Sequence, residues 1–405
     1  MNVRLCVTYL KKYSFTEFIS KFFTRIKKNL FAFMAKRFFS VNSDKIVFLN
    51  FSGNYDCNPK AICEKIISEN LDYILVWGVD NLDKVKDQFP DNVKLVKKGT
   101  FGFYKELSSS HFIIDNGVSC AHYMYKKKIS QVLIETWHGS LGIKRFDRET
   151  NKDKAFEIKA IAESKMTDYL ISCSSFESEI YQKTYWPDKE IWEIGHPRND
   201  ILFSDDITKS FIKQKVCSLY NIDANSNICL YAPTFRDNEA LNVYENINVE
   251  KLLEALQKIK PGKWFVFFRL HYRDYSRAKE FANYKNMIDV SDFADISDLL
   301  AFVDVGITDY SSWICEYVLT RRPGFIFASD YNDYIRNDRL LAYPIDTLPF
   351  PVAYDMKQLT NNIENFDKTE YIKNVESILH MMGSVDDGSA SEYAVQKIRN
   401  INEEL

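Results

Sequence analysis

The chain has 405 residues, of which 46% are hydrophobic and 27% are charged. This balance is typical of a folded globular protein and excludes a disordered or fibrous chain, while the length favours two domains over a single hydrophobic core. The net charge of −3, without a basic stripe interleaved with aromatic residues, argues against nucleic-acid binding.

A basic amphipathic helix is predicted at the amino terminus, over residues 14–39. Apolar residues from Phe15 to Met34 recur there at helical intervals, with Lys and Arg between them. The segment carries too many charges to span a bilayer and lacks the cleavage site of a signal peptide. We therefore predict that residues 1–40 lie in the interface of an anionic membrane. The alternative is a helix packed against its own domain.

Two successive series of strands and helices follow. In residues 41–200 we predict strands at 45–51, 73–78, 93–96, 111–115, 131–135 and 168–173. In residues 201–405 the alternation begins again, with strands at 228–234, 264–270, 287–290 and 305–307 and helices at 249–259, 296–302 and 313–319. Strands alternating with helices indicate a parallel sheet, so we predict two doubly wound α/β domains facing each other across a cleft. The glycine fingerprint of dinucleotide binding and the phosphate-loop lysine motif are both missing.

A glycine-flanked histidine follows one of the predicted strands. His138 lies in the loop Thr136-Trp137-His138-Gly139-Ser140, directly after strand 131–135. A histidine titrates near neutral pH and can take a proton, and glycines let a ligand approach the backbone. The alternative is a loop histidine that is satisfied by local hydrogen bonds.

Two strand ends in the second series offer basic side chains. Arg269 and His271 alternate onto the same side of strand 264–270, where they could neutralise a diphosphate. Thr234 and Arg236 offer a hydroxyl and a guanidinium at the end of strand 228–234. Ordinary ion pairs are the alternative.

Two serines link the strand 305–307 to the helix after it. Ser311 or Ser312 is expected to cap this helix, whose first N–H groups and dipole favour a bound anion. The segment 307–312 is therefore a predicted phosphate site, and an ordinary capped helix is the alternative.

Cysteine and carboxylate spacings do not indicate a metal site. The eight cysteines are scattered from Cys6 to Cys315, as expected for reduced, mostly buried thiols in a cytoplasmic protein. Asp292, Asp295 and Asp298 recur three apart without His or Cys in a ligand pattern, so solvated carboxylates are expected.

With these motifs in this order, the chain resembles the CDP-glycerol glycerophosphotransferase family, whose members build poly(glycerol phosphate) and related teichoic-acid or capsule polymers. The resemblance extends over about residues 47–397. Its landmarks are the segments 58–61, 136–139, 195–200, 231–237, 269–271, 307–312 and 387–392. Glu316 stands where the family usually has an aspartate, and His196 stands where a tyrosine is usual.

The resemblance implies a GT-B-like fold, with an acceptor-side domain at residues 41–200 and a CDP-alditol-binding domain at residues 201–405. It implies transfer of an alditol phosphate, glycerol phosphate first, from a CDP-alditol to a hydroxyl of a lipid-linked or polymeric acceptor, with release of CMP. The expected location is the cytoplasmic face of the cell membrane, as a peripheral protein. No cofactor or metal is expected, and the oligomeric state is left open.

The resemblance also assigns roles to residues. His138 matches the proposed catalytic base, and His271 is expected to act at the diphosphate. The residues expected to bind substrate are Gly139, Ser140, Leu141, Gly142, Arg198, Pro233, Thr234, Arg236, Arg269, Leu270, Thr308, Asp309, Ser311, Ser312 and Glu316. Two alternatives remain: a GT-B glycosyltransferase that uses a nucleotide sugar, since one fold hosts many functions, and a non-catalytic membrane-associated binding protein.

Overall fold

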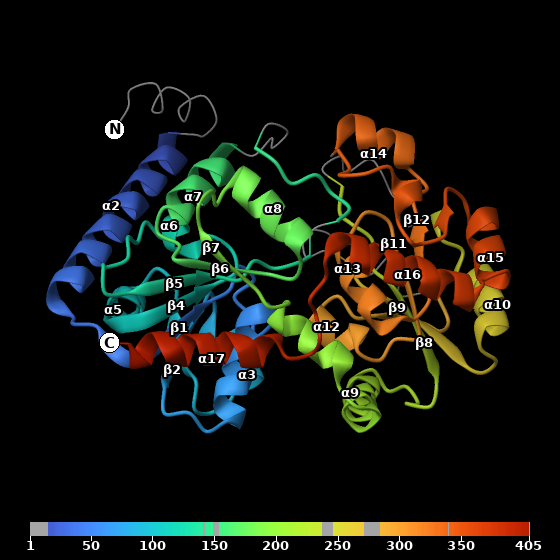
Figure 1. Ribbon diagram of the computed structural model, residues 1–405, viewed down its shortest axis with the longest axis horizontal. Helices are drawn as coiled ribbons and strands as arrows, with labels where there is room; N and C mark the ends of the chain where they lie inside the picture. Colours follow the sequence, from blue (N-terminus) through green and yellow to red (C-terminus); the bar gives the residue numbers. More distant parts are fainter. Residues whose placement is uncertain are drawn as a thin grey trace.

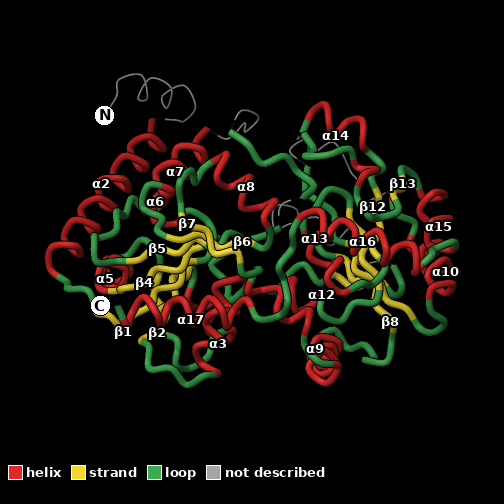
Figure 2. The backbone as a smooth tube through the Cα atoms, viewed as in Figure 1, coloured by secondary structure: helices red, strands yellow, loops and turns green. Residues whose placement is uncertain are grey.

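The computed structural model describes residues 15–140, 142–148, 154–236, 246–270, 284–338 and 340–404. These residues form two α/β lobes that lie side by side, each built around one parallel sheet (Figure 1). Helices cover both faces of each sheet, as Figure 2 shows in red around the yellow strands. The two doubly wound domains expected from the sequence are confirmed.

The N-terminal lobe contains a parallel sheet with the strand order β3-β2-β1-β4-β5-β6-β7. Its strands are β1 (Asn42–Leu49), β2 (Ile74–Val79), β3 (Lys94–Lys97), β4 (Ser110–Asp115), β5 (Val132–Glu135), β6 (Tyr169–Ser172) and β7 (Glu190–Glu193). Its helices are α2 (Phe15–Phe38), α3 (Cys57–Ser68), α4 (Leu82–Val85), α5 (Phe101–Ser109), α6 (Ser119–His122), α7 (Lys154–Ser164) and α8 (Ser175–Thr184). The central strand β4 is buried along its whole length, which explains its continuous apolar run Phe112-Ile113-Ile114.

The C-terminal lobe repeats this arrangement with the strand order β10-β9-β8-β11-β12-β13. Its strands are β8 (Asn227–Tyr231), β9 (Trp264–Phe268), β10 (Met287–Asp289), β11 (Val305–Thr308), β12 (Gly324–Phe327) and β13 (Val352–Ala353). η2 (Pro197–Phe203) links the two lobes. The helical elements of the C-terminal lobe are α9 (Asp206–Leu219), α10 (Val249–Ile259), α12 (Ile296–Leu300), α13 (Trp313–Tyr317), η5 (Val318–Thr320), α14 (Tyr331–Asn337), η6 (Ile345–Thr347), α15 (Met356–Glu364) and α16 (Lys368–Met382). The predicted helix 249–259 is present as α10, and the side chain of Asn248 caps it by accepting from the N–H of Lys251.

The last helix, α17 (Ala390–Glu403), crosses back to the N-terminal lobe, where Figure 1 shows it in red below the sheet. Ala394, Val395 and Ile398 join the core formed by β1, β2 and α3. The predicted division placed these residues in the domain of residues 201–405, and the structure differs there. The apolar stripe of α17 packs beside α3 on the same face of the first sheet.

Helix α2 runs along the outer edge of the N-terminal lobe (Figure 1). Ala32 and Ala35 are buried against the lobe, and the ring of Phe31 lies 5.6 Å from that of Phe101 on α5. The opposite face leaves Phe23 63% exposed and Phe33 70% exposed. Among the described residues, no helix combines the length and the apolar composition needed to cross a bilayer.

Candidate functional site

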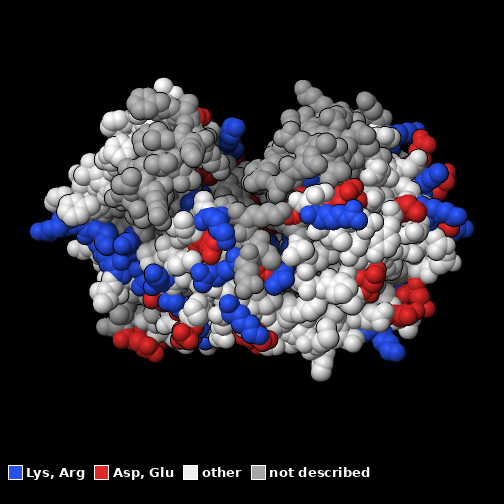
Figure 3. Space-filling view, turned by 90° about the horizontal axis from the view of Figure 1, so that it is seen from above, with Lys and Arg blue, Asp and Glu red and all other residues white. Residues whose placement is uncertain are grey.

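In each sheet the strand order reverses beside the first strand, because the later strands are added on its other side. Such a reversal leaves a crevice beyond the carboxyl ends of the strands. In the N-terminal lobe this crevice lies between β1 and β4, where Phe51 and Asn116 follow the strands. In the C-terminal lobe it lies between β8 and β11, which lead into Thr234 and Asp309. The molecule is hollowed between the two lobes when it is seen from above (Figure 3).

His138 is held in one orientation at the N-terminal crevice. Its Nδ1 lies 2.7 Å from the carbonyl oxygen of Asn116. Because a carbonyl only accepts, Nδ1 carries the proton and Nε2 is left as an acceptor. The rings of Phe51 and Trp137 lie 4.6 and 4.3 Å from the imidazole. Burial, followed by the positive charge of Arg198, lowers the pKa of His138 to about 4, so the imidazole is neutral at neutral pH.

The loop after His138 docks against the start of α13 in the other lobe. A Cβ atom on Gly139 would lie 3.3 Å from both Arg198 Nη2 and Ser312 Oγ. The N–H of Ser140 donates to Glu316 Oε1 at 2.8 Å. A Cβ atom on Gly142 would lie 2.8 Å from Cys315 Sγ, so only glycine fits there without a shift. This docking brings His138 and Ser312 to the same crevice.

Arg198 and Glu316 form a buried ion pair that joins the lobes. The side chain of Arg198 is 8% exposed and that of Glu316 is fully buried. Arg198 Nη1 also donates to the carbonyl oxygen of His138 at 2.8 Å. The guanidinium therefore ties the His138 backbone to the C-terminal lobe, and both residues belong to the predicted set.

Asn58 is a positioning residue that the sequence did not single out. Its side-chain amide donates to the carbonyls of Thr136 and Trp137 at 2.9 and 3.1 Å, and its Oδ1 accepts from the N–H of Arg198 at 3.0 Å. One buried amide thus holds the loops of both His138 and Arg198. Its place in the landmark segment 58–61 was the available signal.

A second buried histidine lies behind this loop. His196 Nε2 lies 3.0 Å from Glu177 Oε2, and both side chains are inaccessible to solvent. The Glu177 carboxylate raises the pKa of His196 against the effect of burial, which favours a charged pair. Cys173 lies close enough to both for the three to be considered as metal ligands, but Glu177 and His196 already form an ion pair with each other.

On the C-terminal side, Arg236 is committed to an internal network. It donates to Asp309 Oδ2 at 2.7 Å, to Asp330 Oδ2 at 2.6 Å and to the carbonyl of Thr234 at 2.6 Å. Asp309 in turn accepts from the N–H of Thr234 at 2.7 Å. These contacts give Arg236 and Asp309 a clear role in shaping the loops after β8 and β11, while their contact with substrate stays a prediction.

The hydroxyl of Thr234 is placed differently. Its Oγ1 is buried and has no hydrogen-bond partner within the described residues. Pro233, just before it, is buried as well. A buried donor without a partner costs free energy unless a ligand or water meets it. The contact of Thr234 with substrate stays a prediction, and this unpartnered hydroxyl supports it.

Ser311 and Ser312 lie beyond β11, half-buried. Ser312 is the residue before α13, but its side chain makes no capping hydrogen bond, and that part of the prediction is wrong. The reason is that Ser312 has φ −67° and ψ −18°, a helical conformation, whereas a capping side chain needs an extended backbone. Thr308, in contrast, donates its hydroxyl to the carbonyl of Ala232 at 2.8 Å.

Arg269 lies at the end of β9 and donates to the carbonyls of Val290 and Phe293. Its neighbour Leu270 is buried, with its N–H bonded to Ser291 Oγ at 2.8 Å. His271 and Leu141, also in the predicted set, lie outside the described residues. Their roles stay predictions.

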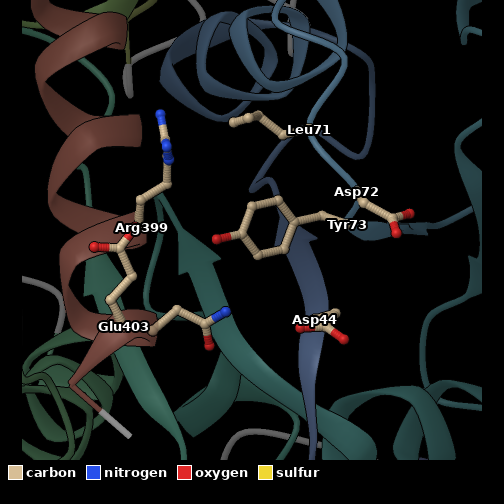
Figure 4. Close-up of a pocket in the computed structure, with 7 residues that line it drawn as sticks. Asp44, Leu71, Asp72, Tyr73, Arg399 and Glu403 are labelled. Carbon is tan, nitrogen blue, oxygen red and sulfur yellow. The ribbon is translucent and has the colours of Figure 1, made fainter.

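Two pockets lie away from this crevice. One, of about 660 Å³, lies behind Arg198, where Lys60 bridges the lobes to Asp295 and Asp298 at 3.0 and 3.1 Å. The other, of about 210 Å³, lies beside the amino end of β1, where Tyr73 and Arg399 face each other (Figure 4). Because ligands of such sheets bind at the carboxyl ends of the strands, the second pocket is on the wrong side for the site.

Comparison with known proteins identifies relatives along the whole chain. Residues 30–400 match the family described as CDP-glycerol:poly(glycerophosphate) glycerophosphotransferase. The chain is 29% identical over 372 residues to the teichoic acid glycerol-phosphate transferase of Staphylococcus aureus, which covers 88% of this chain and 93% of that protein. It is 30% identical over 370 residues to the teichoic acid poly(glycerol phosphate) polymerase of Staphylococcus epidermidis, which covers 87% of this chain but 50% of that protein. The chain therefore spans about half the length of that polymerase.

A solved structure agrees with this assignment. The structure of the wall teichoic acid polymerase TagF, a histidine-to-asparagine variant with CDPG, has a TM-score of 0.81 and 28% identity, and covers 100% of this chain and 99% of that chain. The GT-B-like fold implied by the resemblance is therefore confirmed. Since the family description applies to nearly the entire sequence, this chain belongs to the CDP-glycerol:poly(glycerophosphate) glycerophosphotransferase family.

Proposed function

We propose that this protein transfers glycerol phosphate from CDP-glycerol to a hydroxyl group of a lipid-linked or polymeric acceptor and releases CMP. The observation that carries the proposal is the docking of the His138 loop against Ser312 and Glu316. It brings a neutral imidazole from one lobe to the loops after β8 and β11 of the other, where a nucleotide diphosphate is expected.

The chemistry follows from this placement. The acceptor hydroxyl gives its proton to Nε2 of His138, and its oxygen attacks the phosphorus that bears the glycerol. A new P–O bond forms, the bond from that phosphorus to the oxygen of CMP breaks, and CMP leaves with the electron pair. The hydroxyls of Thr234, Ser311 and Ser312 are the described groups that we expect to stabilise the charge on the diphosphate.

The nucleotide donor is tested by the release of CMP from a CDP-alditol or of UDP from a UDP-sugar. We expect the purified protein to release CMP from CDP-glycerol in the presence of acceptor, and to leave UDP-sugars intact. CDP-ribitol belongs in the same assay, because a relative at 25% identity is a poly(ribitol-phosphate) polymerase. Turnover of a UDP-sugar would favour a glycosyltransferase, and ligand binding without turnover would favour a binding protein. The length of the product separates single addition from polymerisation.

We also propose that α2 attaches the protein to the cytoplasmic face of an anionic membrane, as a peripheral protein. Phe23, Ile26, Leu30 and Phe33 lie three or four residues apart and are all exposed, on the face opposite to buried Ala32. Lys and Arg residues flank this apolar stripe on the same helix. An exposed apolar stripe between cations suits the interface of an anionic bilayer.

Replacing Phe23 and Phe33 with serine should weaken binding to vesicles that contain anionic lipid. The loss of two rings that enter the bilayer should lower the partition coefficient by about a hundredfold or more, since each contributes on the order of 1.5–3 kcal/mol when fully removed from water. Cosedimentation measures it. A matched control replaces Ile207 and Phe211, which are 80% and 66% exposed on α9. Equal vesicle binding by both variants would contradict the role of α2.

A further inference from the structure

A cluster of basic side chains, two lysines and a histidine, lies beside α2 in the N-terminal lobe. It consists of Lys28 on α2, His122 at the end of α6 and Lys159 on α7, and is called the cationic cluster below. Lys159 Nζ lies 3.2 Å from His122 Nδ1, and Lys28 Nζ donates to the carbonyl oxygen of His122 at 3.2 Å. Three elements that are distant in sequence thus bring their basic groups to one point.

The cluster is not neutralised by the part of the chain that the structure describes. Neither Lys28 nor Lys159 forms an ion pair there. The neighbouring carboxylate, Asp80, already lies 3.5 Å from Lys98 Nζ and accepts from the hydroxyl of Tyr123 at 3.4 Å. Burial and the nearby lysines lower the pKa of His122 to about 4, and burial together with Lys159 lowers that of Lys28. The imidazole of His122 is therefore neutral at neutral pH, and the two ammonium groups beside it repel each other unless an anion joins them.

The cluster is connected to His138 through one short segment. Asn116, whose carbonyl orients His138, is six residues before His122, and α6 lies between them. A second connection runs through Lys98, which lies 3.5 Å from Asp80 beside the cluster. Lys98 Nζ donates to the carbonyl of Asn50, and the ring of the next residue, Phe51, contacts His138. The cluster therefore lies in the N-terminal lobe, on the His138 side, and away from the β8–β11 loops of the other lobe. Lys and Arg side chains gather on the outer edge of the N-terminal lobe, at the left of Figure 3.

We propose that the cationic cluster binds a phosphate or diphosphate group of the acceptor, behind the hydroxyl that His138 deprotonates. This inference rests on the proposed function and adds the place and the chemistry of acceptor recognition. Two ammonium groups and an imidazole match the several oxygens of a phosphate, for which lysine acts as a point charge. The donor diphosphate is excluded as the occupant because it is expected in the opposite lobe. The exposed apolar stripe of α2, on the same helix as Lys28, would place a lipid carrier beside the cluster.

The test uses the full chain with Lys28→Gln and Lys159→Gln combined. The matched control combines Lys27→Gln and Lys165→Gln, which remove the same charge from outside the cluster. The probe is a short glycerol phosphate oligomer with a free terminal hydroxyl, compared with the same oligomer carrying neutral methylphosphonate linkages. We expect the KM for the phosphate oligomer to rise about tenfold in the cluster variant alone, because two charge-assisted contacts are lost. The kcat, the KM for CDP-glycerol and the KM for the neutral oligomer should stay unchanged.

Two further measurements keep the inference separate from the proposed function. Calorimetric binding of the phosphate oligomer, without CDP-glycerol, should show the same loss of affinity and does not depend on turnover. Cosedimentation with anionic vesicles should be equal for the two double variants. An unchanged KM and affinity for the phosphate oligomer, or equal losses for both oligomers, would overturn the inference. A loss of vesicle binding with unchanged oligomer affinity would assign the cluster to lipid head groups and overturn it as well.

Discussion

Replacing His138 with asparagine should lower the kcat for CMP release by about 10²–10⁴-fold, which is the usual contribution of general-base catalysis. Asparagine can still donate to the carbonyl of Asn116, so the loop should keep its conformation, but it offers no basic nitrogen at the position of Nε2. The affinity for CDP-glycerol should stay nearly unchanged, because the donor is expected on the other lobe. Single-turnover kinetics and calorimetry measure the two quantities.

The control for this experiment is His380→Asn, since His380 is an exposed histidine on α16. It should behave like the unmodified protein. Near-normal turnover by the His138 variant would remove the imidazole from the mechanism, whereas a loss of donor affinity with normal kcat would make it a binding residue.

The protonation of His138 gives the same prediction a pH dependence. Its pKa is lowered from 6.5 to about 4, mainly by burial, so the group is neutral above about pH 4 and charged below it. Activity that depends on this base is therefore present at neutral and mildly acidic pH and is lost as the pH falls through about 4. Titration of the His138 ring by NMR in the free protein measures the pKa directly. A value at or above 6.5 would contradict the environment described for this loop.

The second large effect is expected at the ion pair between the lobes. Arg198→Met leaves the Glu316 carboxylate fully buried without its cation, and should lower the free energy of unfolding by about 3–5 kcal/mol. It also removes the donor to the His138 carbonyl, so turnover should fall as well. Urea denaturation and CMP release measure the two effects.

Combining Arg198→Met with Glu316→Gln separates stability from positioning. The double variant no longer buries an unpaired charge, so most of the lost stability should return. Turnover should not return, because the His138 carbonyl still lacks the hydrogen bond from the guanidinium, even though the amide oxygen of the new glutamine can accept the N–H of Ser140. Recovery of both quantities together would mean that the pair stabilises the fold without positioning the base.

Much of the fold could be predicted because local pattern and tertiary environment agree. The helix predicted at residues 249–259 is present as α10, with a polar cap at its start and one apolar face. Strands such as β4 are buried on both faces, and their apolar runs are visible in the sequence. Strands β7, β12 and β13 were not predicted, because two to four residues carry too little periodicity to recognise.

The candidate site was likewise predictable only in part. The motif order around His138, Arg198 and Ser312 could be seen in the sequence, and the comparisons confirm the family to which these motifs belong. The partners that those residues contact could not be predicted from the sequence. Arg236 shows this, because the sequence predicted a substrate contact with an ordinary ion pair as the alternative, and it did not indicate that the guanidinium is shared between Asp309 and Asp330.

The sequence by itself determined the alternation of strands and helices and the positions of polar residues at strand ends, because these depend on residues close together in the chain. Only the tertiary structure decided that His138 is neutral, that Arg198 reaches Glu316 across the lobes, that α17 returns to the first lobe, and that Lys28, His122 and Lys159 meet. Each of these depends on burial or on a contact between segments tens to hundreds of residues apart. No local pattern records such a contact, since the packing of whole sheets and helices creates it.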